Sequence, residues 1–228
     1  ARTRYLTAPL IREVVNGILI EKGLEEHRHK LTRLGLPVHD VSAYLFKSKA
    51  MFDASSICEE FGKNVLEEYT LLNALPRDIA DAYLSGEIHL HGLGYWILKP
   101  REIIHDLRFF IKNGLSPNPA NISQPHIKTP KNFGSALNLT LNALLQASKE
   151  TDGLQVLEYF NVFLAPFLKG LDVATVKEAL RLFIVSLSHH INASINLELM
   201  VPKFLADKPV VGFASGCYGD FIDEGQLL

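Results

Sequence analysis

Apolar and polar side chains alternate along the stretch Ile191-Asn192-Ala193-Ser194-Ile195-Asn196-Leu197-Glu198-Leu199. Because successive residues of a β-strand point to opposite faces, the alternation predicts a nine-residue strand with one apolar and one hydrogen-bonding face. A second alternating stretch, Glu87-Ile88-His89-Leu90-His91, predicts a strand that carries both histidines on its polar face. Helical patterns flank both stretches. The sequence therefore predicts a helix-rich α/β or α+β fold with few strands.

Most of the remaining chain carries apolar residues at helical spacing. This spacing predicts helices at residues 9–22, 54–72, 76–85, 100–113, 133–144, 154–164 and 173–187. Cys58 falls on the apolar face of the second of these helices, so we expect it in the core. Four prolines lie within residues 115–131 and predict an irregular connection there. Long connections of this kind tend to carry function.

The composition excludes several classes of protein. The chain has 228 residues, of which 47% are hydrophobic, and this excludes a disordered protein. The net charge of −2 lacks the positive excess of a nucleic-acid-binding surface, and no apolar run approaches the ~20 residues that cross a membrane. Cys58 and Cys217 are too few for a disulfide framework and favour a reducing, cytoplasmic compartment. Since Ala1 is not a Met, we expect a piece of a longer protein.

Three groups of polar residues are candidates for a functional site. His89 and His91 have the spacing of a metal-chelating pair, as in metal-dependent hydrolases, but they also fit a hydrogen-bonding role without metal. The polar face formed by Asn192, Ser194 and Asn196 is either solvated or lines the interior of a barrel whose outer face is covered by helices. Lysines beside the proline-rich connection, including Lys131 and Lys169, are either solvated or bind nucleotide phosphates.

Six segments carry a resemblance to one family. The stretches 5–13 and 21–40 resemble the junction between an ATP-cone and the catalytic domain of anaerobic ribonucleoside-triphosphate reductases. Residues 82–91 and 105–115 resemble the helix that leads into the first barrel strand of these enzymes and the helix that follows it. Thr129-Pro130-Lys131 and the stretch 164–171 are similar to later family segments. The resemblance therefore extends along nearly the whole chain.

The resemblance implies a class III, oxygen-sensitive reductase with a ten-stranded α/β barrel of the glycyl radical type. Residues 1–40 are then the C-terminal remnant of an ATP-cone with its connector, and residues 41–228 are the N-terminal part of the barrel domain. Such an enzyme converts ribonucleoside triphosphates to deoxyribonucleotides through a glycyl radical, which an iron–sulfur activase installs with S-adenosylmethionine, and a cysteine thiyl radical. We expect both radical sites beyond Leu228, so that this part alone carries no catalytic residue.

The resemblance also implies roles for individual residues. His89, His91, Asn192, Ser194 and Asn196 are expected to line the substrate site through hydrogen bonds, without a metal. The helices of this part are expected to build a homodimer interface and an allosteric site for deoxynucleoside triphosphates or ATP, with Lys131 and Lys169 as phosphate contacts. Glu102 stands where many members have a cysteine. A non-catalytic nucleotide-binding relative therefore stays an alternative, as does a metal-dependent hydrolase that uses His89 and His91.

Overall fold

A computed structural model describes residues 8–31, 34–36, 38–47, 54–116, 126–212 and 214–228 of the chain. These residues form two compact units, 1–94 and 95–228, and each unit is described by itself. Every helix in the described part of the chain is too short or too polar to span a lipid bilayer. The division that the sequence predicts after residue 40 falls within a helix of the first unit and stays a prediction about family domains.

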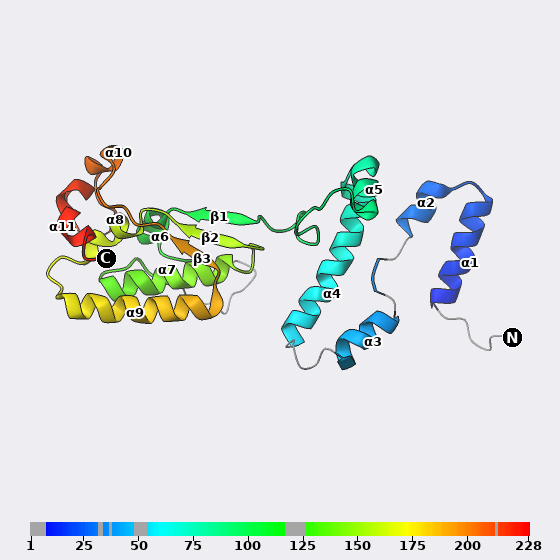
Figure 1. Cartoon of the computed structure of the whole chain (residues 1–228), viewed down its shortest axis with the longest axis horizontal. Helices are drawn as coiled ribbons and strands as arrows, with labels where there is room; N and C mark the ends of the chain where they lie inside the picture. Colours follow the sequence, from blue (N-terminus) through cyan, green and yellow to red (C-terminus); the bar gives the residue numbers. More distant parts are fainter. Residues whose placement is uncertain (1–7, 32–33, 37, 48–53, 117–125, 213) are drawn as a thin grey trace. The chain divides into compact units, whose positions relative to one another are not determined.

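All regular secondary structure in the described residues of the first unit is helical (Figure 1). Its elements are α1 Ala8–Glu21, α2 Glu25–Lys30, α3 Val38–Lys47, α4 Ala54–Tyr69, a π-helical turn Thr70–Ala74, and α5 Arg77–Ser85. Gly23, with φ +68°, makes the turn between α1 and α2, and Gly86, with φ +81°, ends α5. Both dihedral angles are in the left-handed region that favours glycine. The helices predicted before Gly23, after residue 53 and before Gly86 are confirmed.

Two predictions for the first unit are wrong. Residues 87–91 form bends and a turn instead of a strand. The reason is that the N–H groups of Glu87 and Ile88 both donate to the carbonyl of Ala82, at 2.9 and 3.3 Å, and so close the end of α5 instead of starting a β-ladder. Cys58 is exposed on α4, although its spacing predicted a core position.

The second unit contains a three-stranded parallel sheet with the order β1-β2-β3. The strands are β1 Glu102–His105, β2 Leu154–Leu157 and β3 Ala193–Ile195. Helix α7, Phe133–Ala147, lies between β1 and β2 in the chain, and α9, Val173–His190, lies between β2 and β3. Figure 1 shows both helices against the same face of the sheet. Parallel strands joined by crossover helices confirm the predicted helix-rich α/β class.

Two helices predicted for this unit are partly strands. Residues 102–105 and 154–157 form β1 and β2, and helical backbone begins only in α6, Leu107–Asn113, and α8, Phe160–Leu164. Short apolar runs fit both periodicities, and pairing with distant strands decides between them. The nine-residue strand predicted at residues 191–199 is confirmed only over Ala193–Ile195, because the chain of β2 turns away at Tyr159, which has φ +53°.

The helices α7 and α9 begin at side-chain caps and carry the core of the unit. The Asn132 Oδ1 atom accepts from the N–H of Ser135 at 2.8 Å, and the Asp172 carboxylate accepts from the N–H of Thr175 at 2.9 Å. The predicted apolar stripes of both helices are confirmed, because these residues of the stripes are buried: Phe133, Leu137, Leu144, Val176, Phe183 and Leu187. Phe183 stacks on Phe160 of α8 with 5.7 Å between ring centroids.

Short elements complete the second unit. They are η2 Ala165–Phe167, α10 Lys203–Ala206, η3 Tyr218–Phe221 and α11 Ile222–Gly225. The proline-rich connection is described only at its two ends, where Leu115 and Ile127 form an antiparallel bridge; its residues 117–125 lie outside the described part. The bridge brings the chain back to the start of α7.

Candidate functional site

The two faces of the sheet have different surroundings. Ile103, Gln155 and Ala193 are in register, and their side chains point to the same face. This face is covered by helices, because the Gln155 Nε2 atom donates to the carbonyl of Leu144 in α7 at 3.1 Å. The neighbouring row, which contains Ile104 and Ser194, points to the opposite face, and the Ile104 side chain there is 61% exposed. We call this second face the open face of the sheet.

The polar residues predicted on the last strand lie on the open face. Backbone pairing with β2 includes Asn192, whose carbonyl accepts from Gln155 at 3.0 Å, and Asn196, whose N–H donates to Leu157 at 2.9 Å. The alternation of side chains therefore extends from Asn192 through Ser194 to Asn196. The Ser194 hydroxyl donates to the Asn196 Oδ1 atom at 3.4 Å. The structure thus brings these residues to one face, as the alternation predicted, whereas their role as substrate contacts stays a prediction.

A buried histidine lies on the covered face at the end of β1. The Nε2 atom of His105 is 2.9 Å from the Gln155 Oε1 atom. Because the amide nitrogen of Gln155 already donates to Leu144, its oxygen is the acceptor and the histidine nitrogen is the donor. Burial lowers the pKa of His105, and the bond to Gln155 only partly opposes this effect. His105 therefore joins β1 to β2 as a neutral group, and Gln155 continues this connection to α7.

An ion pair follows directly after β1. Asp106 caps α6 and accepts from the N–H of Arg108 at 3.0 Å, while the Arg108 Nη2 atom is 2.8 Å from Asp106 Oδ2. Hydrogen bonds from Arg108 lower the pKa of the Asp106 carboxyl, and the bond to Asp106 raises the pKa of Arg108. The guanidinium also lies 5.0 Å from the ring centroid of Phe163. The structure places both His105 and Asp106 at the end of β1, and the sequence pattern assigned neither of them a role.

Sequence reasoning missed Asn161, a buried residue of α8. Its Nδ2 atom donates to the carbonyls of Glu198 at 2.7 Å and Gly225 at 3.1 Å, and its Oδ1 atom accepts from the Glu198 N–H at 2.9 Å. A signal for this residue exists in the sequence. Asn161 is the one polar side chain in the apolar run Tyr159-Phe160-Asn161-Val162-Phe163-Leu164 apart from the tyrosine hydroxyl, and a buried amide in such a run needs hydrogen-bond partners.

His89 and His91 belong to the first unit and are exposed there. Their ring centroids are 6.1 Å apart, and the His89 ring is 6.4 Å from the ring of Tyr83. The Tyr83 hydroxyl donates to Glu67 at 2.9 Å, and this bond raises the pKa of Tyr83. Within the described residues, no group of three His, Cys, Asp or Glu side chains is placed to hold a metal ion. The alternative of a metal-dependent hydrolase thus has no metal centre in that part of the chain.

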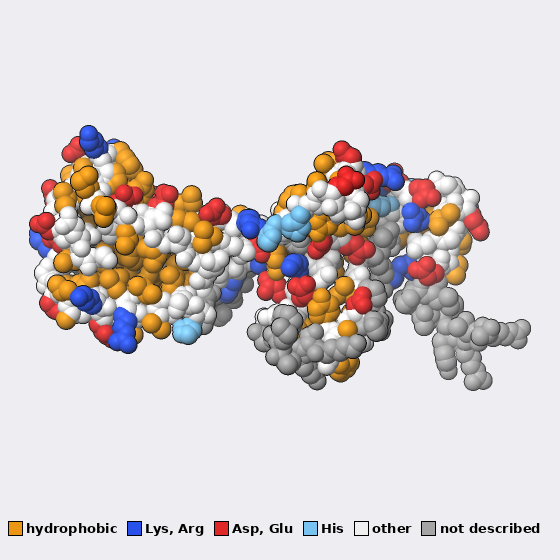
Figure 2. Space-filling view, viewed as in Figure 1, with side chains coloured by type: hydrophobic (Ala, Val, Ile, Leu, Met, Phe, Trp, Pro, Cys, Tyr) orange, Lys and Arg blue, Asp and Glu red, His pale blue; other side chains and the backbone are white. Residues whose placement is uncertain are grey.

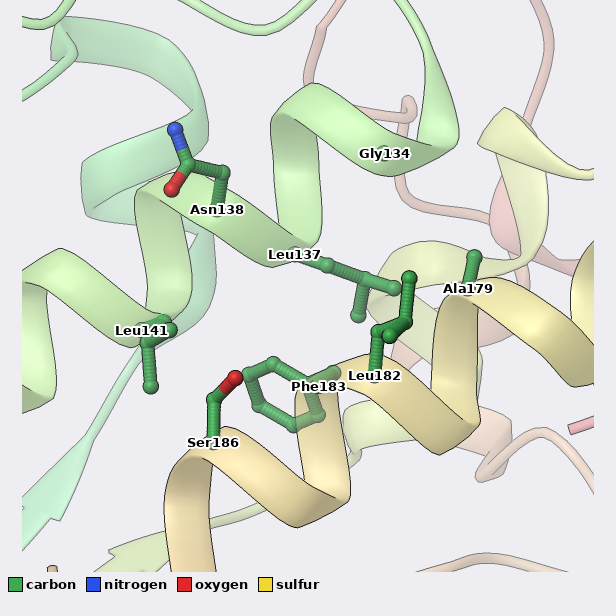
Figure 3. A pocket seen from close by; sticks show the side chains of 8 residues that line it. All are labelled: Gly134, Leu137, Asn138, Leu141, Ala179, Leu182, Phe183 and Ser186. Atoms are coloured by element: carbon green, nitrogen blue, oxygen red, sulfur yellow. The ribbon is translucent and has the colours of Figure 1, made fainter. Parts of the chain in front are cut away.

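A groove of about 220 Å³ lies between α7 and α9. Its lining is mainly apolar and consists of Gly134, Leu137, Asn138, Leu141, Ala179, Leu182, Phe183 and Ser186. In Figure 3, Gly134 and Ala179 lie toward one end of the groove, and Leu141 and Ser186 toward the other, so the two helices run in the same direction. Figure 2 shows hydrophobic side chains exposed over these helices. The side chain of Leu182, for example, is 61% exposed.

The two predicted effector lysines precede these helices. Lys131 comes directly before the cap of α7, and Lys169 lies in the turn before Asp172, the cap of α9. Both side chains are exposed. Because α7 and α9 run in the same direction, their N-terminal ends, and with them Lys131 and Lys169, lie toward the same end of the groove. The structure leaves the predicted binding of phosphate by these lysines as a prediction.

A parallel sheet with crossover helices on one face and hydrogen-bonding side chains on the other defines an α/β protein with a candidate ligand site on the open face of its sheet. Comparison with known families gives the more particular assignment. The model of the family "anaerobic ribonucleoside-triphosphate reductase" matches residues 48–226. The chain belongs to this family.

Individual relatives agree with the family assignment. The anaerobic ribonucleoside-triphosphate reductase of Haemophilus influenzae is 28% identical over 107 residues, which are 46% of this chain and 14% of that protein. The anaerobic ribonucleotide reductase of Thermotoga maritima with citrate in the active site is 16% identical, with a TM-score of 0.67 over 100% of this chain and 45% of that one. The same enzyme in complex with dATP and CTP is 15% identical, with a TM-score of 0.63 over 100% of this chain and 42% of that one. The chain therefore spans less than half the length of these relatives, and the structural similarity shows the fold.

The buried His105 predicts a loss of stability in weak acid. Its pKa in the folded chain lies below the ordinary value of 6.5, so the unfolded chain binds a proton first as the pH falls. Neutral His105 makes its full contribution to the free energy of unfolding above pH 6.5, and this contribution is lost as the pH falls toward the lower pKa of the folded state. The His105→Gln variant does not titrate there. Its free energy of unfolding, measured with urea between about pH 7 and pH 5, is expected to fall less than that of the wild type.

The matched control is His126→Gln, because His126 is exposed. This control is expected to follow the wild-type pH dependence. Equal slopes for the wild type and His105→Gln would contradict the role given to burial. Asp106, whose pKa is also lowered, loses its contribution only at lower pH, below the ordinary carboxyl value of 3.8, and does not interfere.

Proposed function

We propose that this chain forms part of the substrate barrel of an anaerobic ribonucleoside-triphosphate reductase, which converts ribonucleoside triphosphates to deoxyribonucleotides in the cytoplasm. The observation that carries the proposal is the sheet of the second unit, which has helices on one face and the polar residues Ser194 and Asn196 on the other. Family membership supports the same reading. We further propose residues 1–40 as the remnant of an ATP-cone and residues 41–228 as the N-terminal part of a ten-stranded barrel.

The part of the open face formed by residues 192–196 suits a ribose because its polar side chains there are uncharged and form hydrogen bonds. Asn192 and Asn196 each provide an amide that donates and accepts, and Ser194 provides a hydroxyl that does both. Ribose hydroxyls also donate and accept, so such side chains can hold a sugar in one orientation. In this proposal His89 and His91, in the first unit, bind oxygen atoms of the substrate through imidazole hydrogen bonds. The contact between Ser194 and Asn196 fixes the orientation of the Asn196 amide.

The radical steps are assigned to groups other than these side chains. The proposed enzyme works with a radical S-adenosylmethionine activase and a glycyl radical, which supplies the unpaired electron for the reduction when present. We assign neither that radical nor the reactive cysteine to a residue of this chain. Cys58 is exposed on α4, and the Cys217 thiol lies 3.6 Å from the carbonyl of Asp207. The residues of the open face bind and orient the substrate.

A second candidate function is supported by Glu102. In the register of the sheet, Glu102 shares a face with Ile104, which is the open face. A carboxylate thus stands on the substrate side of β1, where the resemblance leads us to expect a thiol in many family members. This observation favours a nucleotide-binding relative without reductase activity as the alternative.

We also propose that the groove between α7 and α9 is covered by a second copy of the chain. Leu182 is 61% exposed, and apolar side chains at helical spacing need a partner helix. Gly134, Ala179 and Ser186 are small and let another helix approach closely. A homodimer of this kind brings together two pairs of parallel helices. At the end where α7 and α9 begin, Lys131 and Lys169 would then bind the phosphates of a deoxynucleoside triphosphate or of ATP.

The substrate proposal predicts that the chain binds CTP and that Asn196→Ala weakens this binding. One lost hydrogen bond raises the dissociation constant by about 2- to 10-fold. Isothermal titration calorimetry measures the effect. Asn142→Ala is the control, since Asn142 belongs to α7 and its amide donates to Asn138 of the same helix. An equal loss for the two variants, or a wild type that does not bind CTP, would contradict the assignment of the open face.

The dimer proposal predicts that the wild type sediments as a dimer and that Leu182→Glu sediments as a monomer. A carboxylate in an apolar interface costs several kcal/mol, so the dimer dissociation constant rises roughly 100-fold or more. Analytical ultracentrifugation over a concentration series gives both constants. Leu199→Glu is the control because Leu199 is 90% exposed and lies outside the groove. A monomeric wild type, or a dimeric Leu182→Glu, would refute this interface.

The effector proposal predicts that dATP stabilises the chain and that the double variant Lys131→Ala, Lys169→Ala loses this effect. At a dATP concentration of 100 times Kd the stabilisation is about 2.7 kcal/mol, which corresponds to a rise in Tm of roughly 5–10 °C. Differential scanning calorimetry measures the rise. Lys112→Ala, an exposed lysine of α6, is expected to behave like the wild type. The same rise in the double variant would remove these lysines from the effector site.

A further inference from the structure

Asn161 forms three hydrogen bonds from a nearly completely buried position. The residue is 6% exposed. Its Oδ1 atom accepts from the Glu198 N–H at 2.9 Å, and its Nδ2 atom donates to the Glu198 carbonyl at 2.7 Å. A side-chain amide thus makes with Glu198 the donor and acceptor pair that a hydrogen-bonded residue of an antiparallel strand makes.

This contact continues the sheet beyond the end of its backbone pairing. The N–H of Asn196 donates to Leu157 at 2.9 Å, and the N–H of Phe160 donates to Asn196 at 3.2 Å. At Tyr159 the chain turns from β2 into α8 with φ +53°, a left-handed conformation that is strained for a tyrosine. The turn places Asn161 beside Glu198, two residues after Asn196. The backbone at Asn196 and at Glu198 is therefore hydrogen-bonded to the β2–α8 segment.

The same amide also holds the last helix of the chain. The Nδ2 atom of Asn161 donates to the carbonyl of Gly225 in α11 at 3.1 Å. Figure 1 shows α11 beside α8, and a Cβ atom at Gly225 would lie 3.9 Å from the Asn161 carbonyl oxygen, so the two segments are in close contact. One side chain thus joins three segments that are far apart in the sequence: α8, the segment after β3, and α11.

We propose that Asn161 is a positioning residue for the ligand site on the open face, and this inference rests on the proposed function. Asn161 is buried and acts through Asn196, whose backbone it fixes by way of Glu198. Few side chains can replace it, because the position requires one acceptor and two donors at the same point. An aspartate keeps the acceptor but directs a carboxylate oxygen at two carbonyls, and a leucine leaves all three backbone groups unsatisfied.

The test compares Asn161→Asp and Asn161→Leu with Val162→Ala in the 228-residue chain. Val162 is the next residue of α8 and is 3% exposed, so its truncation lowers stability without removing the bonds to Glu198 or Gly225. CTP binding is measured well below the lowest Tm of the set. The two Asn161 variants are expected to bind CTP about 10-fold more weakly or worse, whereas Val162→Ala changes the dissociation constant less than about 2-fold. If Asn161 had only a structural role, all three variants would have a lower Tm and the same dissociation constant for CTP.

Hydrogen exchange of the wild type gives an independent measurement if the Asn161 variants do not fold. Saturating CTP is expected to slow exchange at the Glu198 amide, because a ligand held by Asn196 favours the conformation in which Asn161 binds Glu198. Unchanged exchange over residues 195–199, or variants that bind CTP like the wild type, would overturn the inference and leave the proposed function standing. A wild type that does not bind CTP would overturn both.

Discussion

The second unit depends on the pairing of β2 with a strand on each side. Its four residues form backbone hydrogen bonds with β1 and β3, and Leu157 at its end is completely buried. Because all three strands are parallel, the connections between them are crossovers, and α7 and α9 lie on the same face (Figure 1). The other face is left for hydrogen-bonding side chains. The pairing of β2 therefore determines both where the core lies and where a ligand can bind.

The elements that the sequence predicts well are those in which the pattern is long and local. Helices α7 and α9 each extend over four or more turns, with side-chain caps at Asn132 and Asp172 and a buried stripe on one side. By contrast, β1 and β2 have only four residues each. Their short apolar sequences fit the spacing of one helical turn as well as that of a buried strand. Residues 87–91 show the opposite case. The alternating pattern is present in the sequence, but no strand forms, because the N–H groups of Glu87 and Ile88 donate to the carbonyl of Ala82. Strand pairing connects residues that are distant in the chain, so a local pattern cannot fix it.

The same distinction applies to the site. The common face of Asn192, Ser194 and Asn196 follows from alternation, which is a property of neighbouring residues, and the structure places them as predicted. The contacts of Asn161 join residues 37 and 64 positions apart, and no periodicity within the sequence reports them. Its polarity within an apolar run indicates a buried amide, but it does not indicate the partner. Sequence reasoning therefore identified the polar side chains of the open face and missed the one that holds their backbone.

The brevity of the outer strands has a consequence for the behaviour of the chain in solution. Among the strands described, β1 and β3 stand at the two borders of the sheet, with four and three residues. Border strands offer backbone groups to any other extended chain and so promote aggregation, a risk that grows with their length. Three or four residues expose too few such groups for indiscriminate association. Short border strands therefore lower the risk that two copies of the sheet pair through their edges.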